Sequence, residues 1–226
     1  MRAALVTMNV KAGQCAENVQ YMKQQIKRAK EDGADLIVFP QNAVSGYLLG
    51  DVWLDEDFCR YADSFNDELI RESEDIAIVW GNIRYRNRRR FNAAFFAYQK
   101  KTHMRVKQNE LLPYMQDALY FEENPINSAI EYKEDMVFAL NFGDEIQLAD
   151  MNINLDARPY DMQKAYHPHG NVIYVNACGM QNRDHSVMLM EGGSCVLRNG
   201  KCLYQAPYFQ EDYALVDLAS QKEDKE

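Results

Sequence analysis

The chain has 226 residues, 47% of them hydrophobic and 26% charged, a composition typical of a globular domain rather than a disordered segment. Its formal net charge of −9 argues against nonspecific binding to nucleic acid or to an anionic membrane. No apolar stretch is long enough to span a bilayer, and the five scattered cysteines include no CxxC pair, which indicates reduced thiols and a cytoplasmic location.

The first 80 residues alternate between strand and helix patterns. Apolar residues recur at spacings of three and four from Cys15 to Ala29, which predicts an amphipathic helix that ends at Gly33. Because this helix joins two apolar runs, the opening is a β-α-β unit with parallel strands. The predicted elements of this part are strands at 3–8, 35–39 and 76–80 and helices at 15–29 and 58–72.

Strands dominate the remainder. An arginine-rich stretch, 84–90, favours a solvated hairpin turn, with a phosphate-binding patch as the alternative. The stretch 109–124 predicts a long loop, and such loops inside compact domains are usually functional. Further strands are predicted at 92–98, 102–107, 136–140, 146–149, 152–155, 171–176, 186–190, 194–197 and 202–205. The pattern predicts a layered α/β sandwich with mixed sheets.

Neither a linker nor an internal repeat interrupts this pattern. Residues 1–220 are therefore predicted to form one domain, a size that can bury a sizeable core. Residues 221–226 are all polar or charged, and we expect a charged tail or the start of a linker there.

The end of the second predicted strand carries a recognisable signature. It reads Phe39-Pro40-Gln41, followed by Gly46-Tyr47. This resembles the first signature of the nitrilase, or carbon–nitrogen hydrolase, superfamily, in which the strand ends in Phe-Pro-Glu. Passages at 112–121 and 172–212 resemble the glutaminase domain of glutamine-dependent NAD synthetase, so the match covers nearly the whole chain. The resemblance implies a four-layer α-β-β-α sandwich of the nitrilase type, here shortened, that forms a homodimer or a higher homo-oligomer.

The superfamily cleaves amides with a glutamate base, a lysine and a cysteine nucleophile. The resemblance places these three positions on Gln41, Asn109 and Ala149. An amide cannot accept the proton of a nucleophile, and neither Ala149 nor Asp150 carries a thiol. Lys107 lies two residues from Asn109 and could replace it after a small loop shift. The helix expected after Asp150 is missing, which accounts for the shortening.

The same resemblance predicts the residues that line the old amidase pocket. Arg158 stands where the superfamily has a serine before Pro-Tyr, and it either binds a carboxylate or fills the space left by the missing helix. His167-Pro168-His169 is too weak a pattern to predict a metal site, so we expect neither a metal nor a cofactor. The predicted pocket residues are Tyr47, Lys107, Tyr114, Asp150 and Arg158.

Three functions follow from these expectations. The first is a degenerate amidase domain with a structural or assembly role beside an ammonia-using NAD synthetase, as a partner domain or protein. The second is a module that binds a small polar ligand in the old amidase pocket. The third is an active amidase with a shifted site, built on Lys107 and a cysteine outside the expected position.

Overall fold

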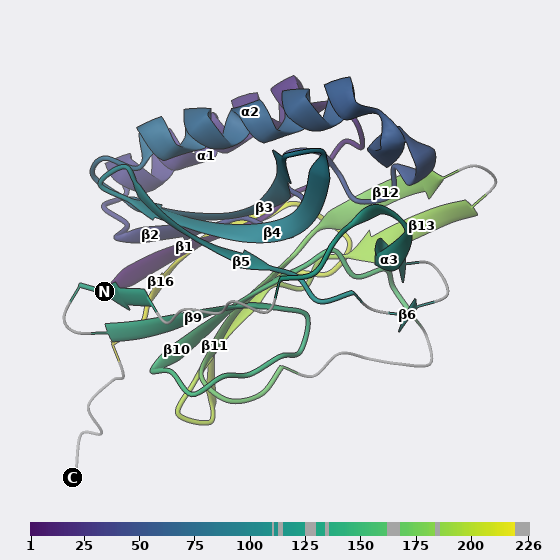
Figure 1. Ribbon diagram of the computed structural model, residues 1–226. Helices are drawn as coiled ribbons and strands as arrows, with labels where there is room; N and C mark the ends of the chain where they lie inside the picture. Colours follow the sequence, from purple (N-terminus) through teal and green to yellow (C-terminus); the bar gives the residue numbers. More distant parts are fainter. Residues whose placement is uncertain are drawn as a thin grey trace, which may run out of the picture.

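The computed structural model describes residues 1–109, 111–112, 115–124, 130–133, 136–161, 168–183 and 186–219. Two six-stranded sheets stack face to face, and two long helices cover the outer face of the first sheet (Figure 1). The arrangement confirms the predicted α/β sandwich with mixed sheets. None of the described helices combines the length and the apolar character needed to cross a lipid bilayer.

The first sheet has the strand order β16-β1-β2-β3-β4-β5. β1 pairs in parallel with β2, and β2 with β3, which confirms the predicted β-α-β opening. β3, β4 and β5 then form an antiparallel meander whose last strand is an edge of the sheet. The strands are β1 (Arg2–Thr7), β2 (Leu36–Val38), β3 (Ala77–Arg86), β4 (Arg89–Tyr98), β5 (Lys101–Val106) and β16 (Asp212–Asp217).

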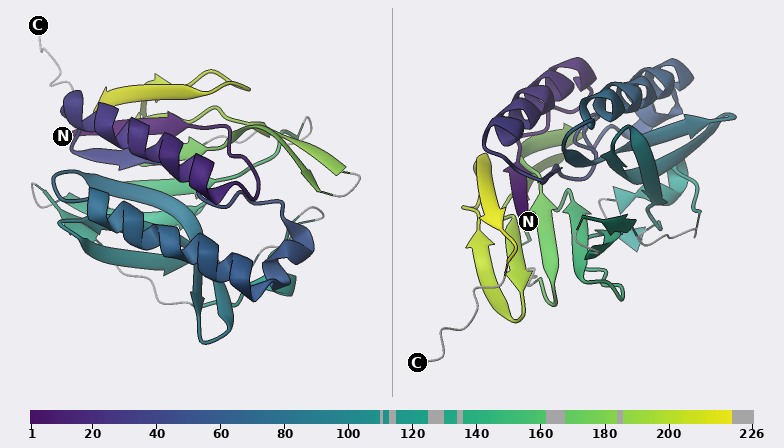
Figure 2. Two further views of the ribbon diagram at one scale, coloured as in Figure 1. Left: turned by 90° about the horizontal axis from the view of Figure 1, so that it is seen from above. Right: turned by 90° about the vertical axis from the view of Figure 1, so that its left-hand side faces the viewer.

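The two long helices, α1 (Cys15–Glu31) and α2 (Glu56–Glu72), lie side by side over this sheet, as Figure 2 shows. The carboxylate of Asp55 caps α2 by accepting hydrogen bonds from the first-turn N–H groups of Asp57 and Phe58. A buried network fixes α2 on β3, because the Asn66 side chain accepts hydrogen bonds from Trp80 Nε1 and Asn82 Nδ2, each at 2.9 Å. Two short helices complete the set, η1 (Gly50–Leu54) and α3 (Asp117–Tyr120).

The second sheet has the order β15-β14-β11-β10-β9-β8, and its inner face packs on the first sheet in one apolar core. Three central strands are parallel, which suits strands buried on both faces. Its strands are β8 (Ile130–Tyr132), β9 (Met136–Phe142), β10 (Met151–Asp156), β11 (Val172–Asn176), β14 (Cys195–Arg198) and β15 (Lys201–Gln205). Two hairpins stand apart, β6 (Leu111–Leu112) with β7 (Met115–Gln116), and β12 (Cys178–Arg183) with β13 (Ser186–Glu191).

The strand predicted at 146–149 is wrong. Residues 143–150 connect β9 to β10 without any regular element, and the Leu148 side chain is fully exposed. The alternation of Ile146 and Leu148 misled the prediction, because both side chains face solvent rather than a core.

The same connection folds over the polar outer face of the second sheet. Gln147 Nε2 donates to Asn141 Oδ1 at 2.6 Å, and Asn154 Nδ2 donates to the backbone oxygens of Gly143 and Glu145 at 2.9 and 2.7 Å. Among the described residues no helix lies against this face (Figure 1). The described chain therefore supplies three of the four expected layers, with a hydrogen-bonded loop over part of the fourth face.

Candidate functional site

Gln41 lies just past the carboxyl end of β2, where ligands usually bind in open α/β sheets. Its backbone N–H donates to the Asp156 carbonyl at the end of β10, with an N–O distance of 3.2 Å, so the segment spans both sheets. Gly81 of β3 lets this segment approach, since a Cβ there would lie 2.5 Å from Gln41 Cα. The strand geometry thus buries Gln41, which is 1% exposed, between the two sheets.

Lys107 follows β5 and enters the same inter-sheet region. Its backbone N–H donates to the Asn92 carbonyl, and its Nζ lies 2.7 Å from Asp117 Oδ2, with both side chains 3% exposed. Tyr47 Oη donates to the other carboxylate oxygen of Asp117 at 2.6 Å. Asp117, at the start of α3, therefore holds the ammonium and the phenol in one buried cluster.

Lys107, not Asn109, is the residue that enters this cluster. Asn109 lies farther along the chain, where its N–H donates to Glu123 and its Nδ2 to the Phe121 carbonyl. The structure therefore places Lys107 in the buried cluster and Asn109 outside it.

Three fully buried amides near this cluster have no hydrogen-bond partner within the described part of the chain. They are Gln41, Asn42 and Asn92, and in each both the side-chain oxygen and the nitrogen lack a partner. Asn92 shares its sheet face with Lys107, because the two are neighbours across β4 and β5. An unpaired buried amide is costly, so each of these three side chains is a candidate to hydrogen-bond a polar ligand.

The structure does not bring Ala149 and Asp150 to this site. Asp150 exchanges hydrogen bonds with Val137, at the amino-terminal ends of β9 and β10. Gln41 contacts the opposite end of β10, and six residues of strand span roughly 20 Å. The chain that does reach the carboxyl end of β9 is Phe142-Gly143, and it carries no thiol either. Tyr114 lies outside the described residues.

Arg158 lies next to the Gln41 segment and forms a second charged cluster, with Asp156. Its Nε lies 2.9 Å from Asp156 Oδ2, which also accepts a hydrogen bond from Tyr174 Oη at 3.0 Å. Burial alone would lower the pKa of Arg158, but the Asp156 carboxylate raises it above its ordinary value, so the guanidinium stays charged. Burial also raises the pKa of the nearby Glu191 carboxyl, and Arg158 partly opposes that shift.

Sequence reasoning missed Asp156 and Glu191. A local signal was available for Asp156, because it is the last residue of a strand and directly precedes Ala157-Arg158. No local pattern marks Glu191, which joins the cluster because its backbone N–H donates to the Arg158 carbonyl at 3.3 Å.

The four buried cysteines are poor nucleophiles. Because the thiolate is the reactive form, a raised pKa makes a thiol inert. Burial raises the pKa of Cys15 and Cys59 to about 11 and of Cys178 and Cys195 to about 12. All five thiols are free, and only Cys202, on β15, is exposed. Within the described residues no group of histidine, cysteine and acidic side chains is arranged to hold a metal ion.

Comparison with known proteins identifies the family and the fold of the chain. Residues 2–137 match the carbon-nitrogen hydrolase family. Over 98% of its length the chain is 24% identical to a glutamine-dependent NAD(+) synthetase from Acinetobacter baylyi, and over 96% it is 22% identical to that of Xylella fastidiosa. It spans only 45% and 44% of these two relatives.

Solved structures show the same fold. The glutamine-dependent NAD+ synthetase of Acinetobacter baumannii, solved with ADP, superposes with a TM-score of 0.80 at 24% identity, over 95% of this chain and 44% of that one. An amidase of the nitrilase superfamily from Nesterenkonia AN1 superposes with a TM-score of 0.81 at 18% identity, over 96% of this chain and 90% of that one. The fold, the position of Gln41 and the family match agree, and the chain belongs to the carbon-nitrogen hydrolase family.

Proposed function

We propose that the chain is a carbon–nitrogen hydrolase domain that has lost amide cleavage and serves in assembly beside an ammonia-using NAD synthetase in the cytoplasm. Two features of the site support the loss. The base position holds the amide of Gln41, and Phe142-Gly143 brings no sulfur to the carboxyl end of β9. A lysine alone offers no route to amide cleavage, because removing a nucleophile costs about 10⁶ in rate.

An exposed apolar surface supports the assembly role. The β12–β13 hairpin extends away from the sandwich (Figures 1 and 2). Opposite residues of an antiparallel pair share a face, and the exposed face of this hairpin carries Met180, Val187 and Leu189 beside Asn182. The rings of Tyr160 and Phe209 extend it, 5.2 Å apart. This hairpin surface consists of Met180 (71% exposed), Val187 (68%), Tyr160 (48%), Phe209 (46%) and Leu189 (39%). Contiguous apolar patches of this kind mark interaction sites.

The relatives indicate the partner. Both are NAD(+) synthetases more than twice as long as this chain, so they contain a large further part. A synthetase domain or protein is therefore the partner that we assign to the hairpin surface.

Substituting Val187→Asp should weaken the complex with the NAD synthetase of the source organism by at least about tenfold, because a charge would be buried among apolar contacts. Sedimentation velocity on the mixture measures this. Leu148→Asp is the control, since Leu148 is an even more exposed aliphatic residue and lies on the connection between β9 and β10. Equal binding by both variants, or no complex with the unaltered chain, would refute the assembly role.

The partnerless amides favour a second function, a module that binds a small neutral ligand. Gln41, Asn42 and Asn92 together offer donors and acceptors, which suits a primary carboxamide such as the side chain of glutamine.

Glutamine should therefore raise the thermal unfolding midpoint, and Gln41→Met should abolish that rise. The same variant should be more stable than the unaltered chain without ligand, because it removes a buried amide that costs about 1–3 kcal/mol when unpaired. Ammonia release from glutamine, measured in the same samples, should not exceed a heat-denatured control. Release above that control would instead support the active amidase, and a flat midpoint would exclude the binding module.

A further inference from the structure

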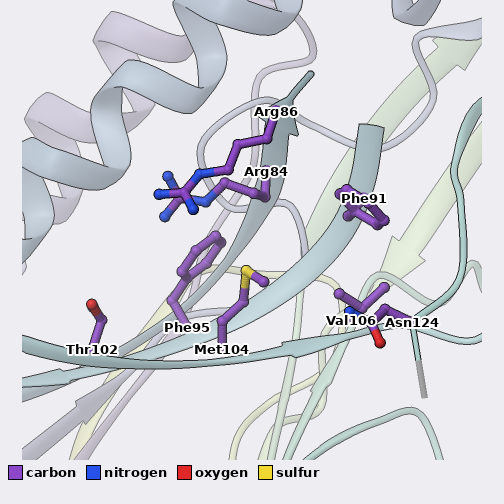
Figure 3. Close-up of a pocket in the computed structure, with 8 residues that line it drawn as sticks. All are labelled: Arg84, Arg86, Phe91, Phe95, Thr102, Met104, Val106 and Asn124. Carbon is purple, nitrogen blue, oxygen red and sulfur yellow. The ribbon is translucent and has the colours of Figure 1, made fainter. Parts of the chain in front are cut away.

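A cavity opens on the helix side of the first sheet. It has a volume of about 220 Å³ and lies on the face of β3, β4 and β5 that turns away from the second sheet (Figure 3). The cross-strand pairs Arg84–Phe91 and Phe95–Met104 show that its lining residues share that face. Lys107 and Asn92 lie on the opposite face of the sheet, so this groove is separate from the unpartnered amide of Asn92.

Two guanidinium groups flank the groove, and they are held differently. Arg84 is fixed, with its Nη1 3.3 Å from Asp63 Oδ1 of α2 and its guanidinium 5.1 Å from the centre of the Phe95 ring. Arg86 is exposed, and no carboxylate among the described residues forms an ion pair with it. Figure 3 shows the two side chains extending in the same direction from β3. Two guanidiniums and one carboxylate leave the groove with one uncompensated positive charge.

The floor of the groove is apolar. Phe95 is fully buried beneath it, Phe91 is half-buried, and Met104 of the edge strand β5 is 37% exposed. An exposed methionine beside aromatic rings offers an adaptable surface for another ring. The volume is below the 300 Å³ or so of common ligand pockets, which limits the ligand to about one ring.

We propose that this groove binds a small aromatic carboxylate, with its ring on Phe91 and Met104 and its carboxylate on Arg86, supported by Arg84. The planar fork of arginine matches a carboxylate. A single uncompensated charge suits a monoanion better than a phosphate dianion. The arginine-rich stretch 84–90 thus holds a specific site at its start rather than only a solvated turn.

Benzoate is the probe that tests this, titrated by isothermal calorimetry against the full chain. It should bind, whereas its neutral analogue benzyl alcohol and inorganic phosphate should each bind at least about tenfold more weakly. Arg86→Gln should weaken benzoate binding by about tenfold, because it removes a charged hydrogen-bond donor from an exposed position. Arg88→Gln makes the same change of charge two residues on, where the side chain is 84% exposed, and should leave binding unchanged.

Two further comparisons test where the ligand binds and which kind of molecule carries the carboxylate. Thr102→Trp places a bulky side chain in the groove and should abolish benzoate binding. Gln41→Met changes a residue that does not line the groove and should not affect that binding. A peptide with a free carboxyl-terminal phenylalanine presents the same chemistry, and its affinity relative to benzoate distinguishes a peptide end from a free acid. Phosphate binding as tight as that of benzoate, or equal effects of Arg86→Gln and Arg88→Gln, would overturn the proposal.

Discussion

The Asp117→Ala variant should lose about 3–5 kcal/mol of its free energy of unfolding, measured by urea denaturation. Asp117 is 3% exposed and accepts hydrogen bonds from both Lys107 Nζ and Tyr47 Oη, at 2.7 and 2.6 Å. Without the carboxylate an ammonium and a phenol stay buried beside an alanine. Taking a charge out of water is costly, and the Coulomb attraction of Asp117, which offsets part of this cost inside the protein, would be gone.

Two control variants separate this explanation from a general loss of packing. Glu74→Ala removes a carboxylate from an ion pair of similar length, 2.8 Å to Lys100, but both side chains are at least half exposed, so the loss should be far smaller than that of Asp117→Ala. Combining Asp117→Leu with Lys107→Met replaces the buried pair by apolar groups and should recover most of the stability lost in Asp117→Ala. A double variant as unstable as Asp117→Ala would show that the loss of the Lys107–Asp117 ion pair is not the cause.

The same cluster shows where sequence reasoning succeeds. Gln41 was located correctly because a local signal, an apolar run closed by a proline, defines the end of β2. Lys107 remained an alternative, because its place depends on how far β5 extends before the chain leaves the sheet. A difference of two residues between Lys107 and Asn109 lies within the usual uncertainty of strand ends, and only the pairing of β4 with β5 resolves it.

The sequence placed Ala149 wrongly in the fold for a different reason. The prediction assigned a strand to 146–149 from alternation alone, and alternation does not say whether the apolar side chains meet a core. Here the asparagines on the outer face of β9 and β10 bind the connection through polar groups, so Ile146 and Leu148 were left in solvent. Contacts between residues distant in sequence decide such cases, including the approach of Asp156 to Gln41.

Gly81→Ala should cost about 3 kcal/mol in the free energy of unfolding, near the upper end for overpacking. The added methyl would meet the Asn42 backbone nitrogen and, at 2.5 Å, Gln41 Cα. Both are backbone atoms, so no side chain can rotate to relieve the contact. A backbone hydrogen bond also ties the segment to β3, since the Gly81 N–H donates to the Pro40 carbonyl at 3.1 Å. The methyl must therefore push the Gln41 segment away from β3.

Because the Gly81→Ala variant displaces the Gln41 segment, ligand binding provides a second measurement beside stability. Gly200→Ala serves as a control, because that residue has a positive φ of 73° but nothing within 4 Å of the added methyl. Its loss should be about 1–2 kcal/mol, from backbone strain alone. If a ligand stabilises the chain through Gln41, Gly81→Ala should also lose that stabilisation, whereas Gly200→Ala should keep it. Equal losses of stability in the two variants would mean that the Gln41 segment yields easily, and its rigid placement between β3 and the end of β10 would then be refuted.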